Sequence, residues 1–203
     1  MTADPTPSSL TIVPANEASW EDLQAIFGTR GDPSRCFCQR YKMAPGESWA
    51  SVGAEELAAR LREQTECGNP RSLTTSGLVA FLDGEPVGWC AVEPRPAYPR
   101  MLRNMRVPWE GRSEDKHDER VWALTCFVTR AGFRKRGITH ALARAAVELA
   151  RERGACTLEG YPITTKEVIL SELHVGTEAA FEAAAFAEAG HPTLRRVIMR
   201  IDL

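Results

Sequence analysis

The chain has 203 residues, of which 43% are hydrophobic, and this length and composition predict a single domain spanning residues 1–203. Its formal net charge is −2, so no overall positive field favours binding to nucleic acid or to an anionic membrane surface. The first residues lack the charged-then-apolar layout of a secretory signal, and no stretch approaches the roughly 18 apolar residues of a membrane span. We therefore expect a soluble, cytoplasmic protein.

The six cysteines lie mostly inside apolar runs, where a free thiol behaves as a small hydrophobic side chain. Cys36 and Cys38 form the one suggestive pair, but a zinc site needs about four ligands. None of the four histidines supplies a second pair at ligand spacing. The sequence predicts reduced cysteines and no metal site.

The first third of the chain mixes recognisable elements with loops. Residues 1–9 are polar and rich in proline and serine, as is typical of a loose tail. A short strand at 10–13 precedes a helix at 20–27, because the spacing of the apolar residues changes from alternating to helical. Residues 28–52 contain several glycines and prolines and predict a long loop or irregular helix, whereas residues 54–66 predict a regular helix.

Two apolar runs, at 78–82 and 86–92, flank the dipeptide Asp83-Gly84 and predict a β-hairpin. Residues 93–118 then carry several prolines and five arginines, a composition that we expect to forbid a regular strand or helix. Two interpretations stay open for this segment. It is either a solvated surface loop or a basic rim that meets phosphate or an acidic substrate.

A strand-helix-strand unit follows. The near-continuous apolar run at 121–128 predicts a buried central strand. A helix with one apolar face begins at Ile138, with Gly154 at its expected end. Residues 156–160 then predict a short strand, reached by a right-handed crossover that makes it parallel to the first.

The last part of the chain is less regular. Residues 161–176 show no pattern, Thr177 stands where it can cap a short helix through Ala185, and residues 197–203 alternate as a strand does. The order of elements predicts a mixed α/β sheet flanked by helices, without internal repeats.

The loop between the central strand and its helix holds the most informative motif, residues 134–139. The first backbone N–H groups of a helix have no partner inside it, and together with the helix dipole they favour phosphate oxygens. Gly137 permits close approach of a ligand, the basic residues add positive charge, and no carboxylate competes in the first helical turn. The motif therefore predicts an anion site, with a basic surface turn as the alternative.

The kind of phosphate ligand can be narrowed further. Gly132 and Gly137 have P-loop spacing, but Ile138 stands where a P-loop needs the lysine that neutralises the terminal phosphates of ATP. No apolar strand ends in a magnesium-binding aspartate, and no Gly-x-Gly-x-x-Gly motif indicates a dinucleotide fold. A P-loop-like nucleotide-binding protein is thus a third, weaker alternative.

The loop resembles the Arg/Gln-x-x-Gly-x-Gly/Ala signature of the GNAT superfamily of N-acetyltransferases, with Thr139 in place of the small final residue. Residues 180–186 are similar to the Tyr-x-x-x-Gly-Phe segment of that family, with Phe181 for tyrosine and Ala185 for glycine. The resemblance covers about residues 77–203. It implies a central, mostly antiparallel sheet that splays open beside the strand at 121–128.

The resemblance also implies acetyl-CoA as the acyl donor, without a metal, and transfer to a primary amine of a small molecule or peptide by direct attack in a ternary complex. A catalytically weak sensor of acyl-CoA is the alternative, which Phe181 keeps open. The sequence does not identify the acceptor amine. It also leaves the oligomeric state open, and a homodimer is one alternative. The implied donor contacts are Cys126, Phe127 and Val128 with the pantetheine, and Arg134, Lys135, Arg136, Gly137, Ile138 and Thr139 with the pyrophosphate.

An acceptor amine must be neutral to attack, and a lysine-like amine with a pKa of about 10.4 is protonated at neutral pH. A general base would therefore help. Glu159, at the end of the strand beside the implied thioester site, is the first candidate, and Glu93, at the end of the hairpin, is the second. Phe181 has no proton to donate to the leaving thiolate, which either departs unaided or takes a proton from Tyr161, Ser171 or His174.

Overall fold

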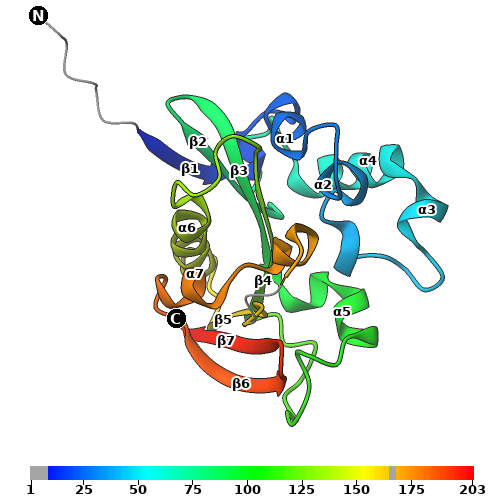
Figure 1. Cartoon of the computed structure of the whole chain (residues 1–203), viewed down its shortest axis with the longest axis vertical. Helices are drawn as coiled ribbons and strands as arrows, with labels where there is room; N and C mark the ends of the chain where they lie inside the picture. Colours follow the sequence, from blue (N-terminus) through cyan, green and yellow to red (C-terminus); the bar gives the residue numbers. More distant parts are fainter. Residues whose placement is uncertain (1–8, 165–167) are drawn as a thin grey trace, which may run out of the picture.

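The computed structural model describes residues 9–164 and 168–203, and its centre is a seven-stranded sheet (Figure 1). The strands lie in the order β1-β2-β3-β4-β5-β7-β6, and neighbours are antiparallel except for the parallel pair β4 and β5. Their bounds are β1 (Leu10–Pro14), β2 (Gly77–Leu82), β3 (Glu85–Pro94), β4 (Val121–Thr129), β5 (Thr157–Gly160), β6 (Ala187–Thr193) and β7 (Arg196–Asp202).

Helices cover both faces of this sheet: in Figure 1, α6 and α7 lie on one side and the earlier helices on the other. The α-helices are α1 (Trp20–Phe27), α2 (Pro33–Cys36), α3 (Trp49–Val52), α4 (Ala54–Thr65), α5 (Pro99–Asn104), α6 (Ile138–Glu152) and α7 (Glu178–Glu182). Short 3₁₀ helices are η1 (Ala15–Glu17), η2 (Gln39–Tyr41), η3 (Arg95–Ala97) and η4 (Leu170–Val175). Within the described residues, no helix has the length and apolar character needed to cross a membrane.

Close packing of helices on the sheet explains the residue types at Gly88 and Trp89. The apolar face of α6 packs against β3, where a Cβ on Gly88 would lie only 2.6 Å from Cγ2 of Ile138. On the opposite face, the fully buried Trp89 packs against Phe27 of α1. Each face of the sheet therefore buries its own core, and the sheet separates the two.

Most elements of strong periodicity form as the sequence predicts. The hairpin turns at Asp83 and Gly84, whose φ angles of 51° and 82° are both positive, as a two-residue hairpin turn of type I′ requires. The predicted helices at 20–27 and 54–66 correspond to α1 and α4. The strand-helix-strand unit is confirmed as β4, α6 and β5.

The structure corrects three expectations. Residues 93–118 do contain a helix, α5, because Pro99 occupies its first turn, where a missing backbone N–H costs nothing. Thr177 precedes α7, but its side chain makes no capping hydrogen bond. The helix ends at Glu182, before Ala185, whose φ of 66° is not helical. The tail expected at residues 1–9 lies, except for Ser9, outside the described residues.

The feature that matters most for function is the divergence of β4 from β5. The two strands pair only from Val121 to Leu124, opposite Thr157 to Gly160. Beyond Leu124, β4 continues to Thr129, and within residues 9–164 and 168–203 it pairs there with β3 alone. A register shift against β3 leaves Thr125 as an additional residue, a β-bulge at the point of divergence. The backbone edge of β4 is thus open from this bulge onward.

Candidate active site

The loop that joins β4 to α6 presents unpaired backbone amides. Its backbone turns through positive φ at Gly132, Lys135 and Gly137, with values of 90°, 62° and 74°. Gly137 occupies the N-cap position of α6 without any capping side chain. The first bond of the helix runs from the amide of Ala141 to the carbonyl of Gly137 at 3.0 Å, so the preceding amides have no partner inside the helix.

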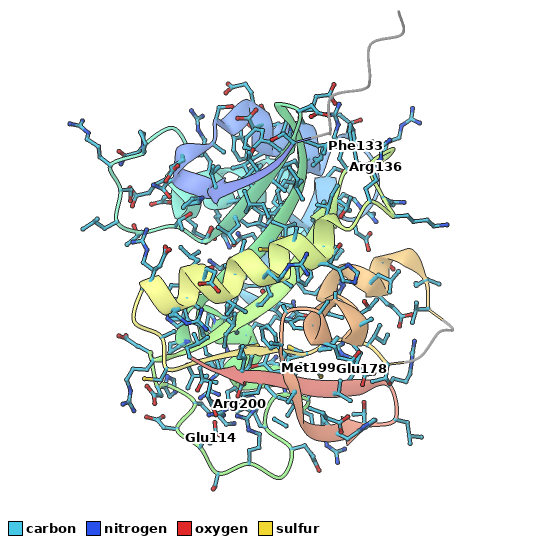
Figure 2. All side chains as sticks on the ribbon, turned by 90° about the vertical axis from the view of Figure 1, so that its left-hand side faces the viewer. Glu114, Phe133, Arg136, Glu178, Met199 and Arg200 are labelled. Atoms are coloured by element: carbon cyan, nitrogen blue, oxygen red, sulfur yellow. The ribbon has the colours of Figure 1, made fainter. Side chains whose placement is uncertain are left out.

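Positive charge surrounds this helix start. The side chains of Arg134, Lys135 and Arg136 are exposed, and within the described part of the chain none of them forms an ion pair. The guanidinium of Arg136 lies 5.4 Å from the ring centre of Phe133, and Figure 2 shows both residues at the same edge of the molecule. A Cβ on Gly137 would meet no atom within 4 Å. Open space, free amides and free cations together fit a diphosphate.

The open edge of β4 leads away from this loop. The side chains of Cys126, Phe127 and Val128 are all buried, alternating between the two cores. Cys126 faces the free thiol of Cys38, with 2.9 Å between the sulfur atoms. Because these side chains are engaged in packing, the backbone is the part of residues 126–128 that is able to pair with an extended ligand.

A hollow of about 570 Å³ lies on the face of the sheet opposite α6 and brings together segments far apart in the sequence. Its walls come from η2, α5 and the residues after it, η4, and the β6–β7 turn. This volume is in the range of small-molecule sites. The lining residues are Arg40, Tyr41, Arg100, Asn104, Met105, Val107, Ile163, Glu172, His174, Thr193, Arg195 and Arg196.

Two titratable side chains of this hollow are hydrogen-bonded to each other. The hydroxyl of Tyr41 lies 3.1 Å from Nε2 of His174, and Nδ1 of the same ring lies 2.8 Å from the carbonyl oxygen of Ser171. Since a carbonyl only accepts, Nδ1 carries the hydrogen and Nε2 accepts from Tyr41. Burial, with the nearby positive charge of Arg40, lowers the pKa of His174 to about 4. The imidazole is therefore neutral at pH 7, with its lone pair directed at Tyr41.

Residues 37–162, more than half of the chain, match the family model of the acetyltransferase (GNAT) family. The chain belongs to the GNAT acetyltransferase family. A search among curated proteins found no match.

Solved structures of similar fold include proteins that hold coenzyme A or acetyl-CoA. The chain is 20% identical to aminoglycoside acetyltransferase AAC(6')-Ib in complex with coenzyme A, with a TM-score of 0.53 over 96% of this chain and 95% of the other. The same values of identity and TM-score hold for that enzyme with paromomycin and acetyl-CoA, over 96% and 93% of the two chains. The protein yncA of Salmonella typhimurium, solved with acetyl-CoA, is 13% identical, with a TM-score of 0.52 over 96% and 94%.

Phe181 is a core residue. It occupies the position at which the resemblance to the GNAT family predicts a tyrosine. It is fully buried between Phe127 and Phe186, whose ring centres lie 5.9 and 5.0 Å from its own. A Cβ on Gly160 would overlap the Phe181 ring, so the glycine makes room for it. Phe181 packs where β4 and β5 separate and contributes no proton.

Glu159 does not project into the hollow but lies in a buried ion cluster. Arg112 Nη2 approaches Glu159 Oε1 to 2.5 Å, and Arg200 Nη1 lies 3.2 Å from the same oxygen. The other oxygen accepts from the hydroxyl of Tyr161 at 2.9 Å and lies 3.5 Å from Arg95 Nη1. Glu159 and Arg95 are completely buried. The more exposed Glu114 completes the cluster, and Figure 2 shows it beside Arg200.

These contacts do not favour the catalytic roles predicted for Glu159 and Tyr161. Both carboxylate oxygens of Glu159 already accept hydrogen bonds, and no surface of the side chain is open to an amine. Burial and the adjacent charge of Glu159 raise the pKa of Tyr161 well above its usual value, which makes it a poorer acid. Both roles stay predictions, and the surroundings suit a structural function better.

Glu93, the second candidate base, lies under the same face of the sheet without lining the hollow. Its Oε2 is 2.5 Å from Nζ of Lys42, and 13% of the side chain is exposed. Burial raises the pKa of Glu93, and the charge of Lys42 opposes this. Burial and the charge of Glu93 in turn raise the pKa of Tyr98. Glu93 thus stays a prediction, separated from the hollow by its own ion pair.

Proposed function

We propose that this protein transfers the acetyl group of acetyl-CoA to a primary amine of a small molecule or peptide, by direct attack in a ternary complex. The observation that carries the proposal is the open edge of β4, which leads to a cationic, uncapped helix start. The 3₁₀ helix η4, which lines the hollow with Glu172 and His174, lies against β4. In the proposal, residues 134–139 hold the pyrophosphate of the donor. The backbone of residues 126–128 pairs with the pantetheine amides.

The chemistry follows from these positions. The neutral amine attacks the thioester carbonyl carbon, a C–N bond forms, the C–S bond breaks, and coenzyme A leaves as the thiolate. As the amine loses its proton to Tyr41 Oη, Tyr41 passes its own proton to Nε2 of His174, which already accepts its hydrogen bond. A pKa of about 4 makes His174 a weak base, so it passes the proton on to solvent and does not retain it. Burial raises the pKa of Tyr41, the charge of Arg196 opposes this, and the nearby Cys126 of β4 adds to it. Glu93 is the alternative proton acceptor in this proposal.

Ligand-dependent thermal stability tests the donor directly. A ligand at 100 times its Kd stabilises a fold by about 2.7 kcal/mol. We expect a clear rise in Tm with acetyl-CoA and with CoA, and none with ATP and magnesium. Stabilisation by ATP alone would overturn the donor assignment.

A screen of amines for release of the CoA thiol then separates an enzyme from an acyl-CoA sensor. An enzyme releases thiol only when a suitable amine is present, at a rate that saturates with amine. A protein that binds acetyl-CoA tightly but releases no thiol with any amine would be a sensor.

The proton path predicts the behaviour of Tyr41→Phe. This variant keeps the ring and removes the hydroxyl, so we expect turnover to fall by roughly 10²-fold while acetyl-CoA affinity stays unchanged. Tyr98→Phe is the matched control, because Tyr98 is completely buried and does not line the hollow. Equal turnover in Tyr41→Phe and the parent, with a defect in Glu93→Gln instead, would move the proton path to Glu93.

A further inference from the structure

The hollow that contains Tyr41 and His174 has an uneven charge. Four arginines line it, against a single carboxylate, Glu172. This local excess contrasts with the chain as a whole, which has more acidic than basic residues. Some ligand or protein group must therefore offset the positive charge when the hollow is filled.

Among the residues that the structure describes, a carboxylate neutralises one of the four arginines. Arg195 Nη2 lies 3.0 Å from both oxygens of Glu172. In the described part of the chain, no carboxylate lies within 4.0 Å of Arg40, Arg100 or Arg196. All three are partly buried, so water screens their charge less than it would on an exposed side chain.

Uncharged groups hold these three guanidiniums in place instead. Arg40 lies over the ring of Trp49, 4.5 Å from its centre, and Arg100 Nη1 lies 3.5 Å from the sulfur of Met43. Arg196 donates from Nε and Nη2 to the carbonyl of Tyr161 at 2.9 and 2.6 Å. Stacking and neutral acceptors orient a guanidinium without cancelling its charge, which leaves donors for an incoming anion.

The arginines also lie close to the proposed proton path. The positive charges of Arg40 and Arg196 help to lower the pKa of His174, after the larger effect of burial. Burial raises the pKa of Tyr41, and the charges of Arg196 and Arg40 oppose this rise. An anion held by these arginines would thus lie next to the groups that meet the amine.

We infer that the acceptor is a small molecule that carries an oxyanion, a carboxylate or a phosphate-like group, close to its primary amine, and that Arg40, Arg100 and Arg196 bind this oxyanion. The inference rests on the proposed function and adds the class of acceptor to it. Guanidinium groups match carboxylate and phosphate oxygens in geometry as well as in charge. Polycationic amines are disfavoured by the same charges.

Matched pairs of amines test the inference. The panel contains amino acids with the amine in α, β or γ position, each beside its carboxamide, together with aminoalkylphosphonates, their diesters and a polyamine. We expect kcat/KM to be about 10- to 100-fold higher for the anionic member of a pair, since a charged hydrogen-bonded contact contributes about 1.5–3 kcal/mol. Comparison of carboxylates with phosphonates shows which oxyanion is preferred.

The variants Arg40→Gln and Arg100→Gln should each reduce this acid-to-amide ratio about tenfold, because kcat/KM falls more for the acids than for the carboxamides. A purely structural role would lower both members of a pair equally. Arg103→Gln is the control: Arg103 lies on the same helix as Arg100, donates to the carbonyl of Met43 and does not line the hollow. Its ratio should equal that of the parent.

The failures of the two proposals can be told apart. If carboxamides and polyamines are acetylated as well as the acids, acetyl transfer stands and the oxyanion inference is overturned. If no amine is acetylated, the proposed function fails. Binding of the N-acetylated acids and amides is then read from Tm in the presence of CoA. Stabilisation by the acids alone, lost in Arg40→Gln, supports the oxyanion site, and no stabilisation by any acid overturns it.

Discussion

Replacing Glu159 with glutamine is expected to destabilise the fold by about 3–5 kcal/mol, because Arg95 and Arg112 then share only the partly exposed Glu114 as a carboxylate partner among the described residues. Arg95 is completely buried and 13% of the Arg112 side chain is exposed, so water cannot take the place of the lost carboxylate. The measurement is the midpoint of urea unfolding, followed by tryptophan fluorescence.

The neighbouring carboxylate provides the control for this variant. Glu114 contacts the same arginines but 42% of its side chain is exposed, so Glu114→Gln should cost less than about 1 kcal/mol. The catalytic prediction for Glu159 requires a different pattern. A general base would leave the unfolding midpoint of Glu159→Gln unchanged, with a turnover defect that shrinks as rising pH deprotonates the amine. That pattern would restore Glu159 as the base.

Replacing Gly137 with aspartate is expected to reduce acetyl-CoA affinity by about 100-fold or more, without unfolding the protein. The aspartate places a carboxylate at the helix start where the pyrophosphate is proposed to accept backbone hydrogen bonds, and losing such charged contacts costs about 1.5–3 kcal/mol each. The open space around Gly137 accommodates the side chain, although its φ of 74° adds some strain. Isothermal titration with acetyl-CoA measures the effect.

Gly68→Asp separates strain from site chemistry. Gly68 is exposed, has a φ of 82° and has open space around it, but it lies at the end of α4. The substitution should bring similar strain with unchanged acetyl-CoA affinity. Parent-like affinity in Gly137→Asp would mean that the donor phosphate binds elsewhere.

The strand, loop and helix of the proposed donor side could be predicted from the sequence because they are contiguous. The apolar run of β4, the basic loop and the periodic face of α6 follow one another within about thirty residues, so the local pattern carries the whole arrangement. The edge strand β6 could not be predicted in this way. Most of its residues are exposed, and its sequence contains Gly190 and Pro192, which do not favour a strand. The strand forms because it pairs with the buried β7.

The acceptor side could not be predicted, because it depends on contacts between distant parts of the chain. Tyr41 and His174 are 133 positions apart, and Tyr41 lies in the segment 28–52, whose short helices show no clear period. The buried surroundings of Glu159 could not be predicted for the same reason. Its position at the end of a strand is visible in the sequence, whereas its partners Arg95 and Arg112, 64 and 47 positions away, are not.

The walls of the hollow come from the connections β1–β2, β3–β4, β5–β6 and β6–β7, whereas the proposed donor site belongs to β4 and the start of α6. Evolution can therefore alter the two halves of the site separately. Substitutions or insertions in these connections reshape the acceptor side and leave the bulged strand and the loop after it intact. Descendants of this chain can acquire a new acceptor while they inherit the same donor unchanged.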